Sequence, residues 1–200
     1  MVTITALTVQ KNNKNRANLF LDGEFFCGLD LTAAVGAGLK VGVEINEERL
    51  KEVVYESEYA SALGRALKYL EIKACSERRI REYLVEKGHG GDVVEAAVAR
   101  LLELGYLDDM AVATEYVKAN GGKYGNGLLR LKLRERGIRS EVIAAVLPNG
   151  EDEAETARSV TENYLGSHPL DRQKLYNYLL SKGFSGETIA VALKMIREID

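Results

Sequence analysis

Apolar and polar residues alternate along this chain in a pattern that occurs three times. Each copy has an aliphatic residue, a leucine four positions later, a glycine four positions after that, and a second apolar stretch beyond the glycine. The copies surround Gly88, Gly137 and Gly183, so they recur at a period of 46 to 49 residues. A period of this length is typical of stacked supersecondary units and not of one enzyme core around a pocket.

Each copy predicts a helix, a tight end and a second helix. The aliphatic positions eight and four before the glycine lie on one helical face, and the basic residue next to the glycine suits a helix C-terminus. The glycine supplies the left-handed backbone that ends the helix, and an acidic residue four positions later marks the first turn of the next helix. The positions predicted to be buried are Ile80, Leu84, Val94, Val98, Leu129, Leu133, Ile143, Leu147, Leu175, Leu179, Ile189 and Leu193.

A further amphipathic helix precedes each pair, near residues 60–71, 109–119 and 153–165. The predicted fold is therefore mainly α, with three tandem three-helix modules that resemble helix-turn-helix repeats. A module of this size buries little core by itself, so we expect neighbouring modules to stack into an elongated or curved array.

The N-terminal residues differ in kind from the repeats. Three short runs rich in β-branched and aromatic residues predict an antiparallel β-meander, and Asp22-Gly23 between the second and third is a hairpin signal. A short helix near 31–36 follows, and Asn46 begins a long helix with Leu50 on its buried face and Glu58 on its acidic face. The predicted domains are 1–45, 46–107 with the first module, 108–150 with the second module, and 151–200 with the third.

Composition limits the class of protein. The formal net charge is -3, which excludes a uniformly basic nucleic-acid-binding coat. The two cysteines, Cys27 and Cys75, lack metal-type spacing and indicate a reducing compartment. The N-terminus has no secretory pattern and no apolar run reaches the ~20 residues of a membrane span. We expect a cytoplasmic monomer with no membrane contact.

Candidate catalytic chemistry is sparse. His89 and His168 have no matching ligands at metal spacing, so neither a metal nor a cofactor is predicted. The segment Gly121–Gly127 is glycine-rich and precedes a helix, which favours a flexible loop, with phosphate or backbone contact as the alternative. Asp108 and Asp109 are better explained as a helix N-cap and a first-turn acid than as paired catalytic acids. The sequence therefore predicts that the protein is not an enzyme.

Positive charge is concentrated in the second module. Seven basic residues against one acid lie between Lys118 and Arg139, whereas residues 1–60 and 151–200 each hold six basic and nine acidic residues. This distribution favours contact with a partner or nucleic acid, with plain solvation as the alternative. Tyr124 stands beside a cation in a loop, where it could stack on a base or on a partner side chain. The candidate binding residues are Lys118, Lys123, Tyr124, Arg130, Lys132, Arg134, Arg136 and Arg139.

The stretch Leu101–Ile138 closely resembles the central hallmark of the RecX family, regulators of the RecA recombinase. The family pattern has a Gly-Tyr-Leu-Asp-Asp segment, a Tyr-Val, a Lys-Tyr-Gly loop and a helix ending in a basic residue and Gly-Ile or Gly-Val. Here these are Gly105-Tyr106-Leu107-Asp108-Asp109, Tyr116-Val117, Lys123-Tyr124-Gly125 and Arg136-Gly137-Ile138. The resemblance covers about residues 60–200, and the chain departs from the family in its net acidity and in the glycines of Gly125-Asn126-Gly127.

The resemblance implies a non-enzymatic regulator that binds RecA-type recombinase filaments and inhibits their ATPase and strand-exchange activities. It also implies roles in recombination, DNA repair and the SOS response, with weak contact to single- or double-stranded DNA. Two alternatives stay open from the residues alone. One is a helix-turn-helix-like protein that binds DNA directly, and the other is a helical-repeat adaptor for an unrelated protein.

Overall fold

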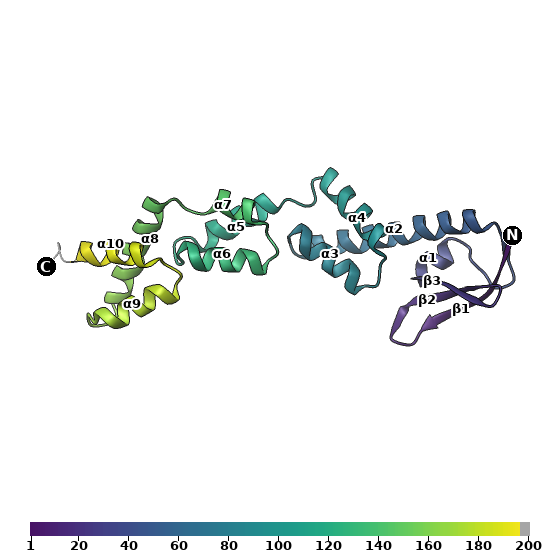
Figure 1. Ribbon diagram of the computed structural model, residues 1–200, viewed down its shortest axis with the longest axis horizontal. Helices are drawn as coiled ribbons and strands as arrows, with labels where there is room; N and C mark the ends of the chain where they lie inside the picture. The colour runs from purple at the N-terminus through teal and green to yellow at the C-terminus, as the bar shows by residue number, and fades with distance from the viewer. Residues whose placement is uncertain (197–200) are drawn as a thin grey trace. The chain divides into compact units, whose positions relative to one another are not determined.

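The computed structural model describes residues 1–196 of the chain. Its contacts divide the chain into two compact units, each of which is described by itself. The first unit comprises Met1–Ala74 and Arg79–Leu107, and the second comprises Cys75–Arg78 and the chain from Asp108 onward. Figure 1 labels the helices of both units and the longer strands. No helix within residues 1–196 combines the length and apolar character needed to cross a membrane.

The first unit begins with a four-stranded antiparallel sheet. Its strands are β1 (Val2–Gln10), β2 (Asn13–Leu21), β3 (Glu24–Asp30) and β4 (Glu44–Ile45), in the order β3-β2-β1-β4. Asp22 and Gly23 have φ values of 48° and 91°, so the predicted hairpin closes through a turn with both central residues left-handed. The meander prediction is confirmed, and the structure adds β4, which pairs with the beginning of β1.

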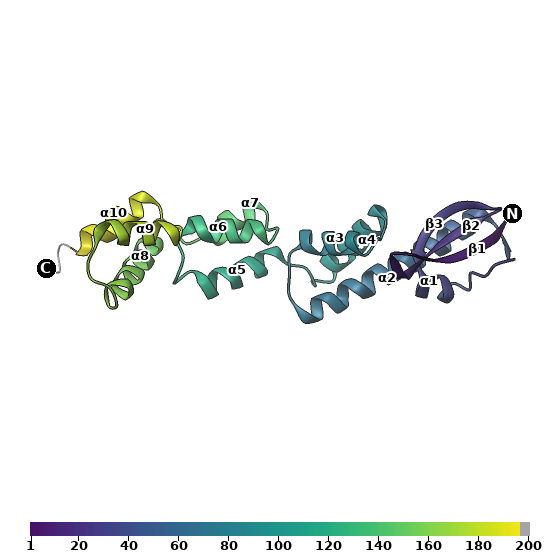
Figure 2. The ribbon, with the colours of Figure 1, turned by 90° about the horizontal axis from the view of Figure 1, so that it is seen from below.

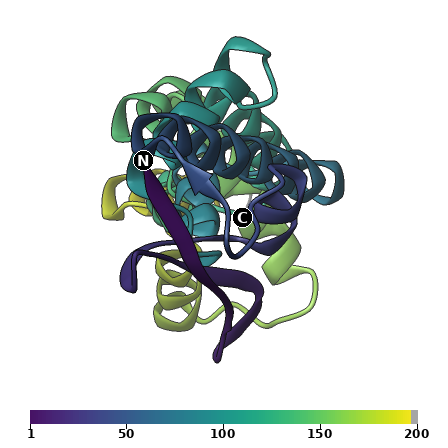
Figure 3. The ribbon, with the colours of Figure 1, turned by 90° about the vertical axis from the view of Figure 1, so that its right-hand side faces the viewer.

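Helices α1 (Leu31–Gly36) and α2 (Glu47–Ile72) pack with the sheet around one apolar core. Figures 2 and 3 show this helix pair beside the strands from two directions. The side chain of Asn46 caps α2 by accepting from the backbone N–H groups of Glu48 and Arg49. The core consists of Ile4, Leu19, Leu21, Leu29, Ala34, Leu39 and Leu50.

The long helix continues without interruption for 26 residues. The helix predicted at 60–71 is therefore not a separate element but the C-terminal part of α2. Ala62 and Ala66 on this part are fully buried, and α2 packs against α4 (Gly91–Glu103). Together with α3 (Glu77–Glu86), these helices form the first three-helix module.

Two further modules lie in the second unit. The middle module consists of α5 (Asp109–Asn120), α6 (Asn126–Glu135) and α7 (Ser140–Val146). The third consists of α8 (Gly150–Leu165), α9 (Arg172–Ser181) and α10 (Gly186–Ile196), and residues 197–200 of the predicted third domain lie outside the described residues. The mainly helical prediction with three three-helix modules is thus confirmed.

The repeated glycines have the backbone that the pattern requires. Gly88, Gly137 and Gly183 have φ values of 85°, 81° and 88°. The two aliphatic positions before each glycine are fully buried, at Ile80, Leu84, Leu129, Leu133, Leu175 and Leu179. The same local sequence therefore forms the same helix end three times, and each module has buried residues of its own.

Candidate partner-binding surface of the middle module

The middle module holds its charged residues on a small apolar core. This core consists of Ala113 of α5, Leu133 of α6, Ile138 in the turn between α6 and α7, and Ile143 of α7. Because Leu129 and Leu133 turn inward, the intervening residues of α6 are directed away from the core. Leu131 accordingly keeps 51% of its surface exposed. The short core thus fixes which of the predicted cations reach solvent.

Six of the seven predicted cations are exposed, and five of these six form no ion pair and no cation–π contact within residues 1–196. These five are Lys118 at the end of α5, Lys123 in the following loop, Arg130 and Arg134 on α6, and Arg139 before α7. We call these five residues the free cations of the middle module, because their charge is available to a partner.

The other two predicted cations are engaged inside the module. Lys132 pairs with Glu135 at 3.0 Å. The guanidinium of Arg136 lies 4.0 Å from the ring centroid of Tyr116, and its Nη1 donates to the carbonyl oxygen of Lys132 at 3.0 Å. A cation over an aromatic face stabilises the local packing. The charges of Lys132 and Arg136 therefore have partners within the module.

Tyr124 lies close to a cation of the third module. The Nζ of Lys182 is 5.8 Å from the Tyr124 ring and 5.2 Å from the Tyr178 ring. Tyr178 in turn contacts Tyr164, with 4.6 Å between ring centroids. Lys182 therefore contacts a ring in each of the two modules, and Tyr124 is only partly exposed.

The glycine-rich segment before α6 is in close backbone contact with the third module. Gly125 donates its N–H to the carbonyl oxygen of Lys182 at 2.9 Å, and Gly127 donates to that of Gly183 at 3.0 Å. A Cβ at Gly125 would lie 2.5 Å from the nitrogen of Phe184. The flexible-loop interpretation is therefore wrong at Gly125 and Gly127. The contact is with the backbone of the third module, which occupies the N–H groups that a phosphate would need.

Asn126 joins the two modules through its side chain as well. Its backbone N–H donates to Glu153 Oε1 at 2.8 Å. Its Nδ2 donates to the carbonyl oxygen of Pro148 at 3.0 Å and to Glu153 Oε2 at 3.1 Å. Both partners of Nδ2 are acceptors, which fixes the orientation of the amide. The beginning of α6 is thus held in one arrangement against α8.

The hallmark residues Gly105, Tyr106, Leu107, Asp108 and Asp109 form a helix end followed by a helix start. Gly105 has a φ of 71° after α4, and Tyr106 donates its N–H to the carbonyl oxygen of Leu101. Asp108 caps α5 by accepting from Ala111 N, as predicted, and Asp109 accepts from Glu77 N, both at 2.9 Å. The two aspartates satisfy backbone donors, which is a structural and not a catalytic arrangement.

The first unit contains a buried ionic cluster that the sequence reasoning missed. Glu58, predicted on the exposed acidic face of α2, is buried, and that prediction is wrong. Its Oε2 lies 3.2 Å from Arg16 Nη1 and 3.0 Å from His89 Nδ1, and its Oε1 accepts from the backbone N–H of Asp30. The partners come from β2, β3 and the α3–α4 turn, so no local sequence signal could have found this cluster.

Hydrogen bonds keep the buried carboxylates ionised. Burial alone would raise the pKa of Glu58, but hydrogen bonds from His89 and Asp30 and the charge of Arg16 hold that pKa below its usual value. Burial acts in the same direction on Asp30, whose pKa is nevertheless lowered by hydrogen bonds from Arg65 and from the first turn of α1. Both groups therefore favour the charged state, and the cluster ties the sheet to both α2 and the α3–α4 turn.

The sequence singles out the two histidines and the acidic side chains of the described chain as possible metal ligands and catalytic groups. Within residues 1–196 no three histidine, cysteine or acidic side chains are grouped to hold a metal ion. His89 is buried against Glu58, and His168 stacks on Tyr164 with 4.3 Å between ring centroids. Both histidines therefore have structural partners.

Three parts of the chain, namely the N-terminal strands and the first and third modules, each match a known family model. Residues 2–46 match the regulatory protein RecX N-terminal domain, residues 62–101 match the RecX first three-helix domain, and residues 151–193 match the RecX third three-helix domain. The regulatory protein RecX of Clostridium perfringens strain 13 is 32% identical over 193 residues, which cover 92% of this chain and 91% of that protein. The chain belongs to the RecX family.

Other RecX proteins agree with this assignment over nearly the whole chain. The regulatory protein RecX of Clostridium botulinum strain Eklund 17B is 30% identical over 203 residues, covering 97% of this chain and 96% of that protein. A crystal structure of regulatory protein RecX has a TM-score of 0.64 with 27% identity, covering 97% of this chain and all of that chain. The RecX structure from Lactobacillus salivarius has a TM-score of 0.62 at 20% identity, covering 70% and 96% of the two chains, and shows the shared fold.

The RecX match also explains the continuous second helix. The first three-helix domain of RecX begins at residue 62 of this chain, inside α2, and the N-terminal domain ends at residue 46, where α2 is capped. Helix α2 therefore begins directly after the N-terminal match and continues into the match to the first three-helix domain. The relatives compared above are regulatory proteins by name.

Proposed function

We propose that this protein regulates a RecA-type recombinase by binding the filament that the recombinase forms on DNA, and that binding inhibits its ATPase and strand-exchange activities. Membership of the RecX family supports the regulatory role. The five free cations of the middle module support a binding surface there. A partner that works on bacterial DNA places its regulator in the cytoplasm, and the protein acts as a monomer.

The observation that carries the proposal is the local concentration of unpaired positive charge on a chain that is acidic overall. The formal net charge is -3, yet Lys118, Lys123, Arg130, Arg134 and Arg139 are exposed on one module without an ion pair in the described chain. A local positive surface attracts an acidic protein surface or DNA phosphates while the acidic remainder weakens attachment to bare DNA. Contact with both the recombinase and its DNA is thus compatible with this charge distribution.

The direct test is a recombinase ATPase assay on single-stranded DNA in which this protein is titrated. The variant Arg130→Glu/Arg134→Glu/Arg139→Glu should raise the concentration for half-inhibition by about tenfold or more, since charge pairs at interfaces steer and fix the complex. Lys132 and Arg136 are left unchanged because both are engaged inside the module. Circular dichroism should be native, because all three altered side chains are exposed.

A matched control makes the same number of charge reversals in the first unit. Lys11, Lys14 and Lys40 are exposed in the first unit, and replacing all three by Glu should leave inhibition within about twofold of the unchanged protein. If the arginine variant inhibits as strongly as the unchanged protein, the assignment of the surface is contradicted. If the unchanged protein has no effect at stoichiometric amounts, the proposed function is contradicted. A mobility shift with bare DNA at about 50 mM salt tests the alternative of direct DNA binding.

A further inference from the structure

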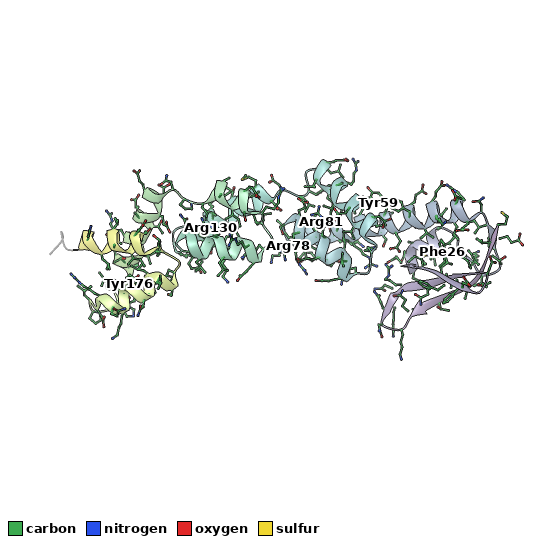
Figure 4. The ribbon with its side chains drawn as sticks, in the orientation of Figure 1. Phe26, Tyr59, Arg78, Arg81, Arg130 and Tyr176 are labelled. Carbon is green, nitrogen blue, oxygen red and sulfur yellow. The ribbon has the colours of Figure 1, made fainter. Side chains whose placement is uncertain are left out.

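A hollow of about 460 Å³ lies where the middle and third modules meet, inside the second unit. Its lining includes both charged and apolar side chains. They are Asn126 and Arg130 of α6, Glu153 of α8, Leu180 of α9, and Phe184 and Ser185 of the α9–α10 turn. Figure 4 labels Arg130 on the middle module and Tyr176 on the neighbouring helix α9. The volume lies within the ~300–1,000 Å³ of typical small binding sites.

The walls of this hollow are held by backbone contacts. Gly127 donates its N–H to the carbonyl oxygen of Gly183 at 3.0 Å, and a Cβ at Gly183 would lie 2.3 Å from the nitrogen of Leu128. Asn126 and Glu153 add the hydrogen bonds between α6 and α8 described above. Because the backbones of the two modules are in direct contact, the hollow is formed before any ligand binds. A preformed site lowers the entropy cost of binding.

The hollow combines an apolar patch with one free charge. Leu180 keeps 51% of its surface exposed, and Phe184 beside it is 2% exposed and belongs to the core of the third module. Arg130 is exposed and forms no ion pair within the described residues. An exposed leucine next to an unpaired guanidinium suits an occupant that offers an apolar side chain and a carboxylate.

A DNA phosphate suits the same hollow less well. Glu153 places a carboxylate in the wall, and its oxygens can only accept hydrogen bonds. Asn126 also lines the hollow, and its Oδ1 is a buried acceptor without a partner in the described chain. A phosphodiester brings acceptors only, whereas a polypeptide brings N–H donors as well as a carboxylate. The chemistry of the wall thus favours protein over nucleic acid.

We propose that this hollow is an anchor site for a protein segment in which a large apolar side chain stands next to an acidic residue. The apolar side chain packs on Leu180, and the carboxylate pairs with Arg130. This inference rests on the proposed function, because the segment is taken to lie on the surface of the recombinase filament. The anchor would then provide the specific part of a contact whose remaining charges act at longer range.

The test compares two leucines of equal exposure. Leu180 and Leu131 are each 51% exposed, but only Leu180 lines the hollow. The probe is a fluorescent recombinase filament, assembled on single-stranded DNA with a slowly hydrolysed nucleotide, and the full-length protein is titrated into it. Leu180→Ser should weaken binding about tenfold or more, as expected for the apolar centre of an interface. Leu131→Ser should stay within about twofold, and thermal unfolding should show both variants folded.

A double-mutant cycle then tests whether the leucine and the arginine contact one segment. Arg130→Gln and Leu180→Ser should each weaken filament binding, and the double variant should lose less than the product of the two single effects. Failure of the unchanged protein to bind the filament would contradict the proposed function and the anchor with it. Filament binding that both variants leave intact would contradict the anchor alone. A parallel loss of affinity for bare single-stranded DNA would make DNA the occupant and overturn the inference.

Discussion

The backbone N–H of Gly127 donates to the carbonyl oxygen of Gly183 at 3.0 Å, so the end of one repeat unit's helix supports the beginning of another's. Gly183 ends helix α9, and its carbonyl oxygen also accepts a hydrogen bond from the first turn of α6. A residue required by the repeat pattern therefore has a second use that the pattern does not reveal. This hydrogen bond holds the backbones of the middle and third modules in direct contact, and both glycines line the hollow.

Replacing Gly183 by alanine should destabilise the second unit by about 3 kcal/mol or more. The residue has a φ of 88°, and its Cβ would lie 2.3 Å from the nitrogen of Leu128, so both backbone strain and overpacking apply. Urea unfolding followed by circular dichroism measures the loss. Gly105→Ala, with a φ of 71° and nothing within 4 Å, carries the backbone strain alone. Equal losses in the two variants would contradict the importance of the close approach.

The variant Glu58→Gln should destabilise the first unit by about 2 to 4 kcal/mol, because it leaves the buried Arg16 without its charged partner. The matched control is Glu52→Gln. Glu52 pairs with Arg49 at 2.8 Å, but both side chains are more than half exposed, so its loss should be below about 1 kcal/mol. Chemical unfolding monitored on the first unit's signals distinguishes the two. A loss as small as that of the control would show that the buried cluster contributes little.

Acid should weaken the first unit through the same carboxylates. The folded-state pKa values of Glu58 and Asp30 lie below those of the unfolded chain, which are about 4.3 and 3.9. Their contribution to stability is therefore complete above the unfolded values and is lost as the pH falls through the folded values. Free energies of unfolding measured between about pH 7 and pH 3 should fall at the acidic end. Glu58→Gln should make the decrease in unfolding free energy with falling pH less steep. An unchanged dependence on pH would mean that other groups cause it.

Cys27 should react slowly with thiol reagents in the folded protein. Burial raises the pKa of its thiol to about 11, with the charge of Glu58 acting in the same direction. Since the thiolate is the reactive form, alkylation by iodoacetamide near pH 8 should be about a hundredfold slower than in the unfolded chain. Mass spectrometry of the Cys27 peptide measures this rate against the same peptide in urea. Comparable rates in the two states would contradict the shift.

Local patterns predicted the elements whose causes are local. The helix ends at Gly88, Gly137 and Gly183, the cap at Asp108 and the hairpin at Asp22-Gly23 all follow from a few neighbouring residues. The exposed cations of the middle module could also be placed, because Leu129 and Leu133 define the buried side of α6. In these cases the periodicity of a helix or the conformational freedom of glycine decides the outcome.

The remaining features depend on residues far apart in the sequence. Glu58 is buried by Arg16, 42 residues away, and by His89, 31 residues away. The glycines before α6 are explained only by the turn that follows α9. The two-residue strand β4 carries too little pattern to be detected, and nothing between 57 and 62 signals whether one helix or two is present. Tertiary contact and not local propensity decided each of these.

The continuous helix α2 also sets the order in which the first unit can be completed during synthesis. Leu50 on its early turns belongs to the core of the sheet, whereas Ala62 and Ala66 on later turns are buried within the first module, where α2 packs on α4. The partner that closes the ionic cluster, His89, is added to the chain long after Arg16. Domains emerge from the ribosome beginning with their N-terminal residues. The strands that are synthesised first are therefore among the last parts of this unit to acquire all of their contacts.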